Sequence, residues 1–87
     1  MPAWIAGRTV AEIDPLNVII GANMRRVRLA RGVTLEALGA AIGKTYQQVQ
    51  KYERGVSGVS AADLARCAVA LTCTMNEFFY GSVSHSK

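Results

Sequence analysis

The chain has 87 residues, a formal net charge of +4 and a hydrophobic fraction of 51%. This length fits one small domain, because compact domains usually need at least about 50 residues. No run of about 20 apolar residues occurs, and the opening MPAWIAGRTV lacks a basic leader with a long apolar stretch. We therefore expect a cytoplasmic protein with neither a signal peptide nor a membrane partner. A chain this small leaves much surface unburied, so it would gain from a partner.

The cysteines and the single histidine do not suggest a metal site. Cys67 and Cys73 are six residues apart in or beside an apolar helical pattern, and His85 lies in a polar tail. No zinc-ligand spacing is present. Cysteines of this kind are typical of small core residues in a reducing compartment. We therefore expect no metal and no cofactor.

The positive charge is concentrated in residues 25–54. This stretch holds seven cationic side chains against Glu36 and Glu53, a balance of +5, while the rest of the chain sums to −1. The seven are Arg25, Arg26, Arg28, Arg31, Lys44, Lys51 and Arg54. Such a patch favours a nucleic-acid partner, although a solvated cationic face is the alternative.

The chain opens with residues 1–16, which show no sustained apolar period and are expected to form a flexible arm. The Asp14-Pro15 pair can open a helix, because proline is accommodated in the first turn. A first helix is predicted from about Val18 to Gly32, which suits the left-handed conformation of a helix end. Its apolar positions are Ile20, Met24, Val27 and Leu29.

Two short helices follow. Thr34 suits the cap of the second helix, and Gly43 ends it after barely two turns. Thr45 caps a third helix that Gly55 closes, with Gln48 at the spacing of a capping box. The second helix carries an apolar stripe of Leu35, Leu38, Ala41 and Ile42. Two short helices across a tight turn with glycine form a helix-turn-helix unit.

Two further helices are predicted after Gly55. Ser60 caps a fourth helix, with Asp63 in the capping-box position, and Thr74 with Glu77 repeats the device for a short fifth helix that Gly81 stops. The fourth helix has the core positions Leu64, Ala65, Cys67, Ala68 and Leu71. With almost no strand-like alternation, the pattern predicts an all-α domain over residues 17–82 and a disordered tail, residues 83–87.

The short fifth helix carries more apolar surface than one helical face can bury. Met75, Phe78 and Phe79 share a face by their spacing of three and four, while Tyr80 points elsewhere. Phe78 suits the core. We expect Phe79 and Tyr80 to lie at the two-fold interface of a homodimer, where each subunit's patch meets its own copy.

The third helix has two faces of different chemistry. Thr45, Val49 and Tyr52 fall on the side that packs. The opposite side carries Gln47, Gln50, Lys51 and Arg54. The glutamine amide matches the N6 and N7 edge of adenine in the major groove, and lysine donates to guanine O6 and N7. This favours base reading, although glutamines also simply cover exposed helix surfaces. Tyr46 either contacts DNA or packs within the protein, and the sequence does not decide between these two roles.

Two stretches carry a family resemblance. The sequence VTLEALGAAIGKTYQQVQKYERG, followed by VSAADLARCAVALTCTMNEFF, resembles the Cro and phage-repressor type of helix-turn-helix regulators, also called the xenobiotic-response-element family. The resemblance spans about residues 18–81. It implies a bacterial protein with a five-helix, lambda-repressor-like domain that binds double-stranded DNA.

The resemblance also implies roles for single residues. It implies that Tyr46, Gln47, Gln50 and Lys51 contact base edges. Phosphate contacts fall to Lys44, Thr45 and Arg54. An arginine of the first helix pairs with the glutamate of the ERG element, here Arg28 and Glu53. This pair is a scaffold contact that orients the third helix against the first.

Three positions depart from the family pattern. Gly39 stands where the family favours alanine, which preserves a close backbone approach to the third helix. Lys44 occupies a turn position that is usually small and apolar, so it either adds a phosphate contact or loosens the turn. Ser57 and Gly58 stand where a related branch has Asn-Arg, so one phosphate-gripping arginine is missing.

The leading hypothesis is a sequence-specific DNA-binding transcriptional regulator, most simply a repressor that acts as a homodimer and blocks polymerase. The alternative is an antitoxin of a toxin–antitoxin pair, which binds a protein partner and autoregulates its operon. The arm would then pack on the partner through Trp4 and Ile5, or lie along DNA through Arg8. A helix-turn-helix relic used only for protein contacts would lack base-reading groups. No catalytic constellation is present, so an enzyme is not expected.

Overall fold

The computed structural model of the protein describes residues 13–81. These residues form four α-helices and one short 3₁₀ helix, without a strand among them, so the all-α prediction is confirmed. The elements are α1 (Pro15–Ala30), α2 (Leu35–Ile42), α3 (Tyr46–Arg54), α4 (Ala61–Leu71) and η3 (Met75–Phe79). The expected arm residues Trp4, Ile5 and Arg8 and the expected tail lie outside the described residues.

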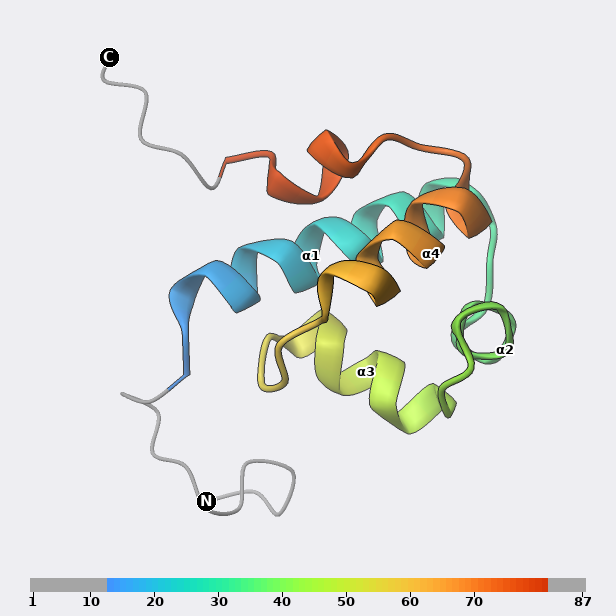
Figure 1. Cartoon of the computed structure of the whole chain (residues 1–87), viewed down its shortest axis with the longest axis horizontal. Coiled ribbons are helices and arrows are strands. Elements are labelled where there is room, and N and C mark those ends of the chain that lie inside the picture. Colours follow the sequence, from blue (N-terminus) through green and yellow to red (C-terminus); the bar gives the residue numbers. More distant parts are fainter. Residues whose placement is uncertain (1–12, 82–87) are drawn as a thin grey trace.

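Helix α1 is the longest element and lies at the centre of the fold. Figure 1 shows α3 on one side of α1 and the segment of η3 on the other, while α4 crosses in front of α1 and α2 closes one end. Among residues 13–81, no helix combines the length and the apolar composition that crossing a membrane requires.

The prediction of five α-helices is wrong in its last element, which is the 3₁₀ helix η3. Its five residues are too few to propagate an α-helical ladder, and the Glu77 N–H donates to the Thr74 carbonyl 3.1 Å away, three residues back. Thr74 makes no side-chain capping bond. The expected capping box with Glu77 is therefore absent.

The α-helices begin where capping side chains satisfy the first backbone N–H groups. Thr34 and Thr45 accept from the N–H groups of Ala37 and Gln48, at 3.0 and 3.2 Å, and Ser60 accepts from that of Asp63 at 3.0 Å. Each such cap contributes about 1 kcal/mol. At Ser60 the expected capping box is incomplete, because the carboxylate of Asp63 pairs with Lys44 and Arg66.

Asp14 sets the start of α1 in the same way. Its carboxylate accepts from the Leu16 N–H at 2.9 Å, and Pro15 is the first helical residue. The last two residues of the expected arm, Pro15 and Leu16, therefore already belong to α1.

The core fills the space between α1, α2, α3, α4 and η3. Its members are Met24, Val27, Leu38, Ile42, Val49, Tyr52, Leu64, Cys67, Ala68, Leu71 and Phe78. Three expected core positions, Leu29, Ala41 and Ala65, are exposed instead, because they lie at the edges of their apolar stripes. Burial raises the pKa of the Cys67 thiol to about 12, so this thiol stays protonated at neutral pH. Cys73 is half-buried and packs against the core.

Helices α1 and α3 approach each other so closely that only glycine fits at the crossing. A Cβ atom added to Gly21 would collide with the carbonyl oxygen of Tyr52 and would lie 2.8 Å from that of Glu53. At the end of α3, Gly55 has a φ of +78°, and a Cβ there would lie 2.5 Å from the Cα of Val18. The backbones of the two helices are thus in direct contact.

Replacing Gly21 by alanine tests this contact. Alanine favours a helix interior by about 1 kcal/mol over glycine, so propensity alone predicts stabilisation. We expect the opposite, a loss of about 1–3 kcal/mol in the free energy of unfolding measured by urea titration, because the α3 backbone must shift. Gly58→Ala is the control, since the atoms nearest to its Cβ would belong to the Asn17 side chain, at 3.3 Å and beyond, and not to a backbone. Equal stability of the two variants would contradict the contact.

Candidate nucleic-acid interface

The turn between α2 and α3 is built on two glycines. Gly43 has a φ of +73°, a left-handed conformation that reverses the chain. Gly39 lets the turn lie directly on α2, because the Lys44 N–H donates to the Gly39 carbonyl at 2.8 Å and a Cβ on Gly39 would lie 2.6 Å from the Lys44 carbonyl oxygen. Alanine, which the family favours at position 39, would force this turn to move.

Helix α3 is fixed through one side. Val49 is fully buried, Tyr52 is 5% exposed and Glu53 is 8% exposed. The expected packing of Val49 and Tyr52 agrees with this burial. Thr45 does not join them, because it is exposed and its hydroxyl caps the helix. The buried side leaves the opposite side of α3 open.

A buried ion pair links α3 to α1. The Nε of Arg28 donates to Glu53 Oε2 at 2.6 Å, and a terminal nitrogen donates to Oε1 at 3.0 Å. The other terminal nitrogen donates to the Val33 carbonyl at 2.9 Å, so Arg28 also holds the connection to α2. The side chains are only 9% and 4% exposed. A bidentate pair of this kind fixes orientation as well as distance.

The open side of α3 carries the residues expected to contact bases. Tyr46 is 43% exposed, Gln47 and Arg54 are exposed, and Gln50 and Lys51 are half-buried. All five lie on one nine-residue helix that the buried pair orients. The arrangement presents amide, phenol and cationic groups together on one side of α3.

A half-open hollow of about 320 Å³ borders this side of α3. It lies between α1 and α3, and its lining residues are Arg25, Arg28, Leu35, Gln50, Glu53 and Arg54. Arg25 belongs to the cationic stretch of residues 25–54, and no role was predicted for it. Arg25 now lies beside Gln50 and Arg54, where it adds positive charge at the edge of the open face.

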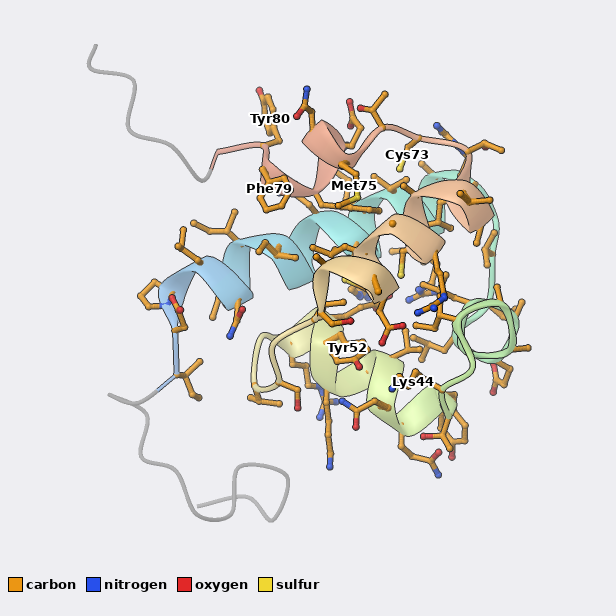
Figure 2. All side chains as sticks on the ribbon, viewed as in Figure 1. Lys44, Tyr52, Cys73, Met75, Phe79 and Tyr80 are labelled. Carbon is orange, nitrogen blue, oxygen red and sulfur yellow. The ribbon has the colours of Figure 1, made fainter. Side chains whose placement is uncertain are left out.

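Lys44 has a partner inside the protein. Its ammonium nitrogen lies 3.6 Å from Asp63 Oδ2, while Arg66 donates to Asp63 Oδ1 at 2.9 Å. The Asp63 side chain is only 8% exposed. Figure 2 shows Lys44 beside the start of α3, so the ion pair ties the helix-turn-helix turn to α4. A contact between Lys44 and phosphate would compete with Asp63.

The residues expected at a dimer interface lie on the far side of α1 from α3. Phe78 is fully buried, whereas Phe79 is 38% and Tyr80 is 77% exposed. Figure 2 shows Tyr80 at the outer edge of the fold and Phe79 closer to α1, both above α1, while α3 lies below it. The two surfaces are therefore separated by the α1 helix.

The sequence matches a known family. The model of the helix-turn-helix family HTH_3 matches residues 24–78. An uncharacterized HTH-type transcriptional regulator of Sinorhizobium medicae is 35% identical over 66 residues, which cover 76% of this chain and 48% of the relative. One from Rickettsia conorii is 35% identical over 81 residues, covering 93% of this chain and 65% of the relative. The chain thus spans about half to two thirds of the length of these relatives.

Solved structures with a similar fold are also regulators and controller proteins. The restriction-modification controller protein C.AhdI from Aeromonas hydrophila has a TM-score of 0.68 and 32% identity, covering 72% of this chain and 96% of that chain. The clp gene regulator ClgR from Corynebacterium glutamicum has a TM-score of 0.74 and 29% identity, covering 78% of this chain and 72% of that chain. The chain therefore belongs to the HTH_3 helix-turn-helix family of transcriptional regulators, the Cro and phage-repressor type.

Proposed function

We propose that the protein binds duplex DNA sequence-specifically through α3 and represses transcription as a homodimer in the cytoplasm. One observation carries this proposal. Helix α3 is buried on one side and bonded to α1 through Glu53, while its other side presents Gln47, Gln50 and Lys51 within a cationic region. The matched relatives are named as transcriptional regulators, which does not favour the antitoxin alternative.

Base reading falls to the residues near the start and middle of α3. Gln47 and Lys51 are four residues apart, so they lie one above the other on the helix and can contact neighbouring base pairs. The glutamine amide suits adenine, and the ammonium suits guanine. Tyr46 and Gln50 flank them, where a ring edge and a second amide extend the contact.

Phosphate contacts fall to the edges of this face. Arg54 lies at the end of α3 and Arg25 lines the adjoining hollow, so both carry charge where a DNA backbone would pass. Thr45 lies at the start of α3, where the backbone N–H groups of a helix attract anions. Lys44 joins this set when phosphate replaces Asp63 as the partner of its ammonium group.

The homodimer joins two such units through Phe79 and Tyr80. Exposed aromatic side chains at a two-fold axis pack against their own copies. Two α3 helices about 34 Å apart would read half-sites one helical turn apart. Bound to an operator, such a dimer represses by blocking polymerase.

Substitutions on α3 should differ in kind. Gln47→Ala and Lys51→Ala should each cost about 1–3 kcal/mol of binding free energy on the preferred site and relax specificity there. Arg54→Ala should weaken all sequences alike and lower the slope of log affinity against log salt by about one unit, because one phosphate contact is lost. The measurement is a salt titration on a site selected from random duplexes and on random DNA.

Arg31→Gln is the matched control, because Arg31 is an exposed arginine that donates to the carbonyls of Leu71 and Thr72 and shares no partner with Lys44. Its slope should stay unchanged. Lys44→Ala should lower the slope by about one unit if phosphate displaces Asp63, and an unchanged slope removes Lys44 from the contact set. Equal losses on selected and random DNA for Gln47, Lys51 and Arg54 variants would refute the division into base and phosphate contacts.

Changing Phe79 and Tyr80 together to serine should give a folded monomer. The loss of the shared apolar patch removes the dimer, and binding to a full operator should weaken roughly a hundredfold or more, because the second half-site no longer gains from effective concentration. Sedimentation at micromolar concentration measures the association. Val69→Ser is the control, since Val69 is 80% exposed on α4. A dimeric double variant, or a monomeric unmodified protein, would contradict this interface.

A further inference from the structure

Asn23 of α1 is a buried polar residue with no part in the α3 face. It is 7% exposed, and its amide nitrogen donates to the carbonyl of Phe78 at 3.0 Å and to that of Tyr80 at 2.9 Å. Its Oδ1 accepts from Arg26, at 3.4 Å from Nε and 3.3 Å from a terminal nitrogen. Both amide hydrogens and the amide oxygen are thus used.

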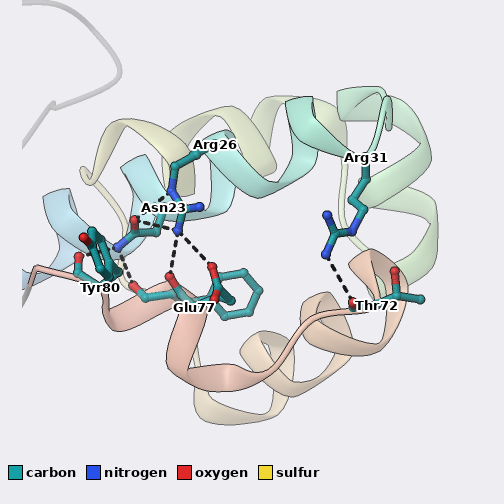
Figure 3. A network of polar contacts seen from close by, with 7 residues as sticks. Asn23, Arg26, Arg31, Thr72, Glu77 and Tyr80 are labelled. Carbon is teal, nitrogen blue, oxygen red and sulfur yellow. Dashed lines mark hydrogen bonds and ion pairs between the residues drawn. The ribbon is translucent and has the colours of Figure 1, made fainter.

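Arg26 adds a second hold on the same segment. One terminal nitrogen donates to both the backbone carbonyl and the carboxylate of Glu77, each at 3.2 Å. The guanidinium carbon lies 5.8 Å from the ring centroid of Tyr80, within the range of a cation–π contact. Figure 3 shows Asn23 and Arg26 reaching from one helix to the backbone of Glu77 and to Tyr80.

The held segment has little structure of its own. Helix η3 has five residues and no side-chain cap, and Tyr80 follows it with a φ of −59° and a ψ of 124°, outside the helix. The last carbonyl groups of a helix have no hydrogen-bond partners within the helix itself. Asn23 and Arg26 supply these partners from α1. The buried ring of Phe78 and the partly buried side chain of Met75 anchor the segment by packing.

We propose that Asn23 and Arg26 form a clamp that positions Phe79 and Tyr80 for pairing with a second copy of the chain. The proposal rests on the homodimer of the proposed function and adds two positioning residues to it. Asn23 is the decisive member, because its burial keeps it from touching a partner. Any effect of Asn23 on association is therefore indirect, and the control variant separates an effect through the clamped segment from a general loss of stability.

The clamp also links the dimer face to the DNA-reading face. The same helix that holds residues 77–80 through Asn23 and Arg26 holds α3 through Arg28 and the close contact at Gly21. The clamp thus sets the position of the dimer axis relative to α3, and with it the spacing of two half-sites.

The test compares two clamp variants with a matched control at the C-cap of the same helix. The variants are Asn23→Ala and Arg26→Gln. The control is Arg31→Gln. Arg31 also donates to backbone carbonyls, those of Leu71 at 2.9 Å and Thr72 at 3.4 Å, but these acceptors lie outside η3. Sedimentation equilibrium gives the dimer dissociation constant, and titration with a single half-site duplex, taken from a site selected from random DNA, gives the affinity of one subunit.

Both clamp variants should weaken dimerisation roughly tenfold or more, since each loses hydrogen bonds worth about a factor of ten in an equilibrium. Half-site affinity should stay within about twofold, because α3 keeps its own contacts with α1. Backbone amides near Tyr80 should exchange hydrogen faster in both variants. Arg31→Gln should change neither association nor this exchange. If Asn23→Ala does not fold, Arg26→Gln decides through hydrogen exchange near Tyr80 measured on the monomer, because Arg26 is exposed and could also contact a partner directly. Unchanged exchange in this variant would overturn the clamp.

The failures are distinguishable. Clamp variants that dimerise as tightly as the unmodified protein overturn the clamp and leave the proposed function intact. An equal loss with Arg31→Gln overturns the clamp as well, since the effect would then be a general loss of stability. A monomeric unmodified protein refutes the homodimer, and the clamp with it.

Discussion

The contact between α1 and α3 is the constraint on which the rest of the structure depends. At Gly21 the two backbones touch, and about two helical turns further along α1, Arg28 forms a bidentate pair with Glu53 that is almost fully buried. Removing one partner of such a pair leaves a buried charge uncompensated and costs about 3–5 kcal/mol. Replacing both by apolar residues often costs nothing. The pair therefore contributes orientation more than stability, and α3 can present a polar face because its other face is fixed.

The other elements are attached to α1 by side chains that donate to backbone carbonyls. Arg28 holds Val33 before α2, and Arg31 holds Leu71 and Thr72 at the end of α4. Among residues 13–81, Thr72 is the only non-glycine residue with a positive φ, at +51°. Its carbonyl accepts from Arg31 at 3.4 Å. Asn23 and Arg26 do the same for η3. A domain with a small core thus gains a defined arrangement from polar side chains of one central helix and its C-cap residue.

The parts of this fold that local chemistry determines could be predicted from the sequence. Thr34, Thr45 and Ser60 mark the helix starts because a capping hydroxyl acts within three residues. The prediction of a fifth α-helix was wrong. Thr74 and Glu77 match the capping-box pattern, but the five residues that follow Thr74 are too few for an α-helix and form a 3₁₀ helix. Leu29 was placed in the core because an apolar pattern does not show where the neighbouring elements end.

The long-range contacts could not be predicted from the sequence. Asn23 meets carbonyls 55 and 57 residues away, and Lys44 meets an aspartate that the pattern assigned to a capping box. Nothing in the residue types predicts such pairs before the packing is known. The Arg28 and Glu53 pair was implied only by the family resemblance. The roles of Gln47, Gln50 and Lys51 remain predictions, since the open face shows what they present and not what they bind.

The most direct test of the α1 and α3 constraint is the ratio of selected-site to random-DNA affinity in the double variant Arg28→Met with Glu53→Leu. Apolar replacement of both partners should recover most of the stability that either single variant loses. The affinity ratio should nevertheless fall at least about tenfold, because α3 has lost the contact that fixes its orientation toward base edges. A double variant that is stable and keeps the full ratio would show that the ion pair does not orient the reading helix.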